Sequence, residues 1–154
     1  MIEPPPGSNL TPYDVNQLDR EGVSLLHWAA INNNFRIVKY FLSKGAIIDR
    51  IGGNQQATPL HWAIRKHLLE MVGLLMHFGA DPMIQDIQGM NCLHVAAMEG
   101  ATSIILYLLA KGMDVNWYAF VSKMHSYKFS CRRYFNYDCI SYLIKWLPLM
   151  NMIS

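Results

Sequence analysis

Three histidines, His27, His61 and His94, are the residues in this sequence best suited to chemistry, because imidazole can bind a metal or transfer a proton. They are separated by 34 and then 33 residues, and each stands in a similar short segment. One histidine per sequence repeat is the pattern of a structural residue, since a metal centre needs several ligands in one place. The spacing therefore predicts a structural role for all three.

Other reactive groups are poorly placed for catalysis or metal binding. His125, Cys131 and Cys139 have 5 and 7 intervening residues, which matches no usual zinc pattern, and no Cys-x-x-Cys pair occurs. The sequence has no nucleophile–base–acid order and no glycine-rich phosphate loop. We therefore expect no catalytic residue, no metal and no cofactor, and we expect reduced thiols, as in the cytosol.

An aromatic site is the stronger candidate. The residue after each repeated histidine is Trp28, Trp62 or Val95, and the residue four positions later is one of a polar set: Asn32, Lys66 and Glu99. Residues four apart share a helix face, so the two tryptophans should stand side by side in a groove, next to the Asn32 amide. Such a surface can bind a peptide, and proline suits an indole face. The alternative is that both tryptophans are core residues.

The elements that position these residues form a repeat. The segments 24–33, 58–67 and 91–100 align with one another, and each is followed by a second apolar set and then by a glycine. Ser24, Thr58 and Asn91 occupy the positions of helix N-caps, and Asn33, His67 and Gly100 those of turns between helices. Each unit thus predicts two short antiparallel helices.

The period of about 33 residues and the Thr-Pro-Leu-His-x-Ala pattern resemble the ankyrin repeat. We therefore predict an all-α ankyrin-repeat solenoid of about three helix–turn–helix repeats. Residues 1–13 are a proline-rich start, 14–22 the tail of a preceding repeat, 23–116 the three repeats, and 117–154 a divergent basic and aromatic tail. The net charge is −2 before residue 117 and +4 after it. Because both ends depart from the repeat, we expect a fragment: a truncated or spliced product, or an inaccurate gene model.

Composition excludes several classes of protein. The chain has 154 residues, 52% of them apolar, and a net charge of +2 without a basic run, so neither disorder nor nucleic-acid binding is expected. No stretch of about 18 apolar residues and no signal peptide occurs, so we expect no membrane span. We expect a cytoplasmic monomer.

The repeats resemble those of one enzyme family, the huntingtin-interacting kind of DHHC-type palmitoyltransferase. The similarity lies in LLHWAAINN at 25–33, VKYFLSKGAIIDRIGG at 38–53, ATPLHWAIR at 57–65 and SIILYLLAKGMDVN at 103–116, and it is expected to stop at 117. The longer connection with Gly52 and Gly53 is a shared feature. So is a tryptophan after the histidine in two successive repeats.

This resemblance carries functional implications. Members of that family are Golgi and vesicle membrane enzymes that S-acylate cytosolic proteins. Their ankyrin repeats face the cytosol and recruit substrates through short, proline-containing linear motifs in disordered segments. The family's recruiting asparagine and tryptophan fall on Asn32 and Trp62. The family's catalytic Asp-His-His-Cys motif and membrane helices are absent here.

Two functions are compatible with these observations. The first is the substrate-recruiting part of a palmitoyltransferase without its catalytic membrane domain. The second is an independent ankyrin adaptor or decoy that binds partners. Enzyme activity of this chain itself is not expected, because the cysteine nucleophile that the family requires is missing.

Overall fold

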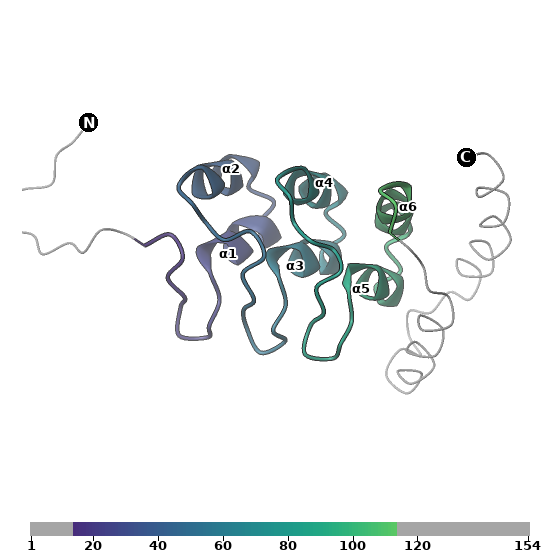
Figure 1. Ribbon diagram of the computed structural model, residues 1–154, viewed down its shortest axis with the longest axis horizontal. Helices are drawn as coiled ribbons and strands as arrows, with labels where there is room; N and C mark the ends of the chain where they lie inside the picture. Colours follow the sequence, from purple (N-terminus) through teal and green to yellow (C-terminus); the bar gives the residue numbers. More distant parts are fainter. Residues whose placement is uncertain (1–13, 114–154) are drawn as a thin grey trace, which may run out of the picture.

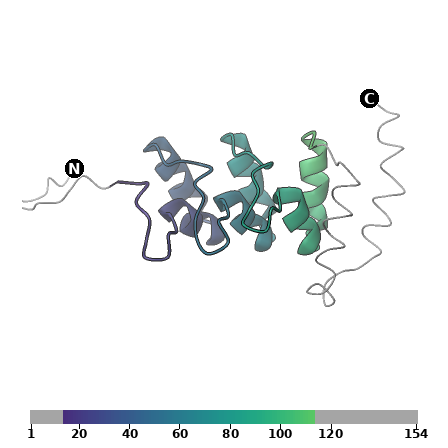
Figure 2. The same cartoon turned by 60° about the horizontal axis from the view of Figure 1, so that its bottom comes forward.

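The computed structural model describes residues 14–113, which form three helix–turn–helix repeats stacked side by side (Figures 1 and 2). The helices are α1 (Leu25–Ile31), α2 (Phe35–Ser43), α3 (Pro59–Arg65), α4 (Leu69–His77), α5 (Cys92–Met98) and α6 (Thr102–Ala110). The inner row consists of α1, α3 and α5, and the outer row of α2, α4 and α6. The connections before the inner helices form fingers on the side away from the outer row (Figure 1). The predicted all-α repeat fold is confirmed. The segments 1–13 and 117–154 lie outside the described residues.

Helix starts follow the predicted N-caps, with one difference. Thr58 and Asn91 each accept a hydrogen bond from the backbone N–H three residues later, and each helix start is a capping box that the histidine completes. Ser24 is also an N-cap, but its side chain makes no cap bond to the backbone. Its hydroxyl instead bonds the His27 ring nitrogen Nδ1 at 2.8 Å. The prediction at Ser24 is therefore right in position and wrong in partner.

The tight turns between paired helices need left-handed backbone. Asn33 and His67 have φ values of 54° and 57°, and Gly100 has 70°. Asparagine, histidine and glycine tolerate this region better than branched residues do. The glycines that follow the outer helices, Gly45 and Gly79, also have positive φ, 85° and 91°. The predicted turn positions are confirmed, and the glycines that the repeat pattern places after each second helix lie just beyond the C-caps Lys44 and Phe78.

The core lies between the two rows of helices and between successive repeats. Small residues line the inner helices, including Ala30, Ala63 and Ala96, which are fully buried. They let neighbouring helices approach closely, while larger side chains from the outer helices fill the remaining space: Val38, Met71, Val72, Leu75, Ile104 and Leu108. This packing makes the inner row a firm support for any site built on it.

The fingers are joined to one another by backbone hydrogen bonds. Gly53 N–H donates to Gly22 O at 3.2 Å, and Ile87 N–H donates to Gln55 O at 2.9 Å. Side chains add to these links: Asn16 accepts from Ile47 N–H, and Asp49 accepts from Asp81 N–H. The fingers therefore form a continuous edge beside the inner helices.

Candidate functional site

Trp28 and Trp62 are brought together, as the sequence predicts. Their ring centroids are 5.8 Å apart and the ring planes meet at 82°, so one indole contacts the other edge-on. The two residues come from the adjacent inner helices α1 and α3. Trp28 is 42% exposed and Trp62 is half-buried. We call these two residues the tryptophan pair; it offers aromatic surface to solvent.

Asp19 fixes Trp28, the more exposed member of the pair. Its Oδ2 accepts a hydrogen bond from the Trp28 indole N–H at 2.9 Å. Its Oδ1 accepts from Glu21 N–H and Val23 N–H, both at 2.9 Å, which holds the carboxylate on the first finger. These hydrogen bonds, the one from Val23 first, lower the pKa of Asp19, so the group is ionised at neutral pH.

Trp62, the half-buried member of the pair, packs closely against Gly53 of the second finger. A Cβ placed on Gly53 would lie 3.2 Å from the Trp62 ring, and one on Gly52 would lie 2.7 Å from the Gly22 carbonyl oxygen. The second finger can therefore approach the first finger and the indole only with glycine at these positions. Trp62 also contacts the His27 ring, with the centroids 5.2 Å apart.

Asn32 lies at the C-cap of α1, one turn beyond Trp28. Its side-chain Nδ2 donates to the Trp28 carbonyl oxygen at 2.8 Å, and the residue is exposed. This bond fixes the amide plane. Within residues 14–113 the side chain makes no other hydrogen bond, so its oxygen can accept from a partner's backbone N–H.

The remaining predicted site residues are less closely grouped. Lys66 and Glu99 are the C-caps of α3 and α5, in the positions equivalent to Asn32; Lys66 is exposed and Glu99 half-buried. Val95, which the helix pattern placed on the exposed surface with the tryptophans, is fully buried. That expectation is wrong for the third repeat. The aromatic surface is limited to the first two.

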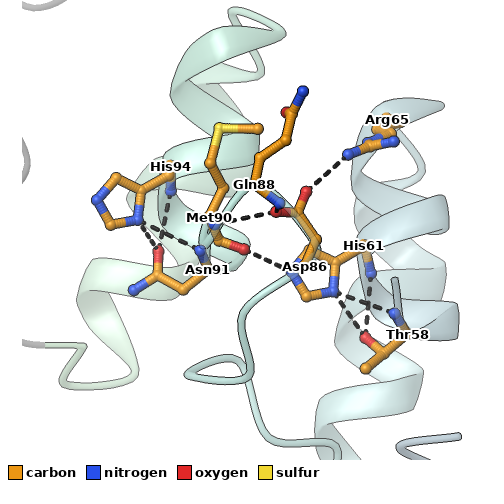
Figure 3. Close-up of polar contacts among 8 residues, drawn as sticks. All are labelled: Thr58, His61, Arg65, Asp86, Gln88, Met90, Asn91 and His94. Carbon is orange, nitrogen blue, oxygen red and sulfur yellow. Dashed lines mark hydrogen bonds and ion pairs between the residues drawn. The ribbon is translucent and has the colours of Figure 1, made fainter. Parts of the chain in front are cut away.

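Two of the repeated histidines, His27 and His61, connect successive repeats. His27 Nε2 bonds the Ala57 carbonyl oxygen at 2.9 Å. His61 Nε2 bonds the Met90 carbonyl oxygen at 3.2 Å, as Figure 3 shows. On the opposite ring edge, Nδ1 meets the N-cap hydroxyl of Ser24 or Thr58. Burial lowers the pKa of both imidazoles, so they are neutral at pH 7 and donate from Nε2 to the carbonyl. These contacts agree with the predicted structural role.

A charged pair closes the third finger. Asp86 is buried, and its Oδ1 accepts from Gln88 N–H and Met90 N–H, while its Oδ2 meets Arg65 Nη2 at 3.0 Å (Figure 3). Asp86 stands five residues before an N-cap, as Asp19 does. The repeated Asp-x-x-Gly spacing could have identified Asp19 from sequence, but its bond to Trp28 could not be read there.

The part of the chain that the structure describes contains neither an activated cysteine nor a metal-binding cluster. Cys92 is buried, and burial raises the pKa of its thiol far above the usual range, so it is a poor nucleophile. Residues 14–113 contain no group of three or more histidine, cysteine or acidic side chains able to hold a metal. No helix in this part of the chain is long and apolar enough to cross a membrane.

Comparison with known proteins places the repeats. A family model described as ankyrin repeats (3 copies) matches residues 8–86 and 69–148. The putative palmitoyltransferase ZDHHC13 of Danio rerio is 55% identical over 104 residues, which are 68% of this chain and 16% of that protein. Palmitoyltransferase ZDHHC17 of Mus musculus is 58% identical over 81 residues, which are 53% of this chain and 13% of that protein.

A third relative matches more of the chain. Palmitoyltransferase ZDHHC13 of Homo sapiens is 43% identical over 142 residues, 92% of this chain and 23% of that protein. Only 12 residues of the chain are then left outside the match, so the resemblance continues beyond residue 116, where the repeat pattern placed its end. The chain spans less than a quarter of the length of each of these relatives.

Proposed function

The chain belongs to the ankyrin-repeat family, and we propose that its tryptophan pair and Asn32 bind short proline-containing segments of cytosolic proteins. In the proposed role, the stack recruits substrates for S-palmitoylation, as the similarity to the ankyrin region of palmitoyltransferases suggests. The module would then act on the cytosolic side of Golgi and vesicle membranes. Transfer of the acyl group would belong to a catalytic domain outside the repeats.

The observation that carries this proposal is the tryptophan pair beside a fixed amide. An indole that is 42% exposed contributes little to the core, yet a large aromatic surface is what a proline ring packs against. The Asn32 oxygen lies one helical turn away and can accept one peptide N–H, which would fix the direction of the bound segment. An aromatic contact and a backbone hydrogen bond together suit an extended peptide.

Replacement of Trp62 tests the aromatic contact. Trp62→Ala should weaken binding of a proline-containing decapeptide by about 2 kcal/mol or more, which is roughly thirtyfold in Kd. It should also lower the melting temperature moderately, because the ring packs on His27 and near Gly53. Titration calorimetry well below the melting temperature separates the two effects.

The matched control is Tyr40→Ala, which removes an exposed aromatic ring from the outer helix α2. This variant should bind the peptide as the wild type does. If Trp62→Ala lowers stability sharply while the folded fraction keeps its peptide affinity, Trp62 is a packing residue and the proposed site is wrong.

Asn32 is tested by two substitutions. Asn32→Ala removes the acceptor and should cost about 1–3 kcal/mol of binding free energy, because a peptide N–H would be left unpaired. Asn32→Asp keeps an acceptor oxygen and should bind more tightly than the alanine variant. Equal losses in both variants would show that the oxygen is not the group in use.

Lys66 and Glu99 are assigned a lesser role in this proposal. They occupy the C-cap positions that follow Asn32 in the next two repeats, so they flank the path of an extended peptide along the inner row. Exposed charges at the rim of an interface act mainly on association rate and salt dependence. Replacement of either by glutamine should change the salt dependence of binding more than the affinity at physiological salt.

A further inference from the structure

We propose that Asp19 is a positioning residue for peptide binding: its carboxylate holds the Trp28 indole edge-on against Trp62 and keeps the indole N–H occupied. This inference rests on the proposed function of the tryptophan pair. It adds a residue of the first finger to a site otherwise built on helices. Because the indole N–H is already bonded, Trp28 offers a ligand ring surface alone.

The carboxylate is itself held in place. Val23 N–H and Glu21 N–H both donate to Oδ1, and the finger is closed by the hydrogen bond from Asp19 N–H to the Val23 carbonyl oxygen at 2.9 Å. The Oδ2 atom that remains meets Trp28 Nε1 at 2.9 Å. The finger backbone thus orients the Asp19 carboxylate, and the carboxylate orients the Trp28 indole, which contacts Trp62.

The equivalent positions of the other repeats show that this contact is not required by the fold. In the second repeat the residue five positions before the N-cap is Gly53, which has no side chain to hold an indole. In the third repeat it is Asp86, whose carboxylate is buried and paired with Arg65. Among the three repeats within residues 14–113, only the first places an exposed carboxylate against an exposed tryptophan, at a position where a hydrogen bond adds little to stability.

Restraint of an exposed side chain has a direct consequence for binding. A free indole would lose rotamer freedom when a ligand orders it, and that loss weakens affinity. With Nε1–H already bonded, Trp28 also has no donor left for a ligand carbonyl, because indole has a single N–H. The partner segment is therefore recognised at Trp28 by apolar or ring contact.

Asp19→Asn is the informative substitution. The amide keeps one oxygen for the Glu21 and Val23 N–H groups, but its NH₂ then faces the indole N–H, so two donors oppose each other. Asp14→Asn is the matched control for charge, because the Asp14 carboxylate is also exposed and also accepts a backbone N–H two residues later, from Asn16. Both variants are made in the full chain.

Two measurements are made on each variant. Nitrogen–proton NMR, with the Trp28 indole signal identified by its loss in Trp28→Phe, reports the shift and order of that N–H. Calorimetry reports the Kd of one proline-containing decapeptide, the tightest wild-type binder from a synthetic array. We expect Asp19→Asn to shift and broaden the Trp28 signal and to weaken binding roughly fivefold, the effect of about one hydrogen bond. Asp14→Asn should change neither, and both melting temperatures should stay near the wild-type value.

A third comparison separates positioning from direct contact with the ligand. In a Trp28→Phe background Asp19→Asn should have no further effect on Kd, because the donor is gone. An equal loss in both backgrounds would mean that the carboxylate touches the peptide, and would overturn the proposal. An unchanged indole signal in Asp19→Asn would also overturn it.

The outcomes distinguish this inference from the proposed function. If the wild-type chain binds none of the peptides, the proposed function fails, and the role of Asp19 in peptide binding fails with it. If the wild type binds and Trp62→Ala loses binding, but Asp19→Asn behaves as the wild type, the proposed function stands and this inference alone is wrong.

Discussion

At the scale of single residues, the two buried imidazoles make stability depend on pH. His27 and His61 have pKa values lowered by burial, so between the folded-state pKa and about 6.5 the unfolded chain binds more protons than the folded chain. The free energy of unfolding is therefore complete above pH 6.5 and falls as the pH drops below it. The slope should reach at most about 1.4 kcal/mol per pH unit for each histidine.

Urea unfolding at pH 7.5 and at pH 5.5 checks this expectation. His61→Gln should reduce the difference between the two pH values, since one titrating group is removed. His67→Asn is the control, because it replaces an exposed imidazole with the residue type found at Asn33, the same turn position of the first repeat. A pH dependence that disappeared in His67→Asn would contradict the assignment to the buried pair.

Residue types and their spacing predicted which residues meet in the site, but not the contacts that their side chains make. The period placed Trp28 and Trp62 on neighbouring helices, which the structure confirms. The edge-on contact, and the bond from Trp28 to Asp19, depend on side-chain rotamers and on the path of the finger, which no spacing encodes. Val95 fits the same pattern and is buried, which the spacing of residues along its own helix does not encode.

At the scale of elements, the second finger depends on its two glycines. Gly53→Ala should destabilise the fold by about 1–2 kcal/mol through backbone strain at φ 70°. A second cost should add to this, because the new methyl group would lie 3.2 Å from the Trp62 ring. Gly45→Ala is the matched control: it has φ 85° and open space around the added atom. We expect the glycine at 53 to be the more costly of the two to replace, as measured by thermal melts.

Peptide affinity adds a second test of the same element. Gly53→Ala should also weaken binding, because Trp62 would have to move, whereas Gly45→Ala should not. Equal effects of the two substitutions on stability and on binding would show that the finger does not hold Trp62. From the sequence, the connection with Gly52 and Gly53 could be identified as longer than the others. The need for glycine there could not, because it arises from the close approach of two fingers and an indole.

At the scale of the whole molecule, stability is unevenly distributed along the stack. The third residue of each outer helix is Ile37, Met71 or Ile104; the latter two are fully buried, while Ile37 is 41% exposed. Ile104→Ala should therefore cost about 2–5 kcal/mol of unfolding free energy. Ile37→Ala should cost about 0.5 kcal/mol or less, as at a surface position. Urea unfolding of both variants measures the contrast, and similar losses would mean that Ile37 is covered in solution.

The histidine contacts between repeats also determine how the molecule would respond to mechanical load. His27 reaches Ala57 and His61 reaches Met90, so each of these contacts spans 30 or 29 residues and joins only neighbours. Tension applied to the two ends would pass through such contacts in series, and each could break without the next. A single-molecule pulling trace should show successive steps, one per repeat of 33 or 34 residues. Each step should release roughly 110 Å of chain, so the stack would lengthen like a spring rather than break at one point.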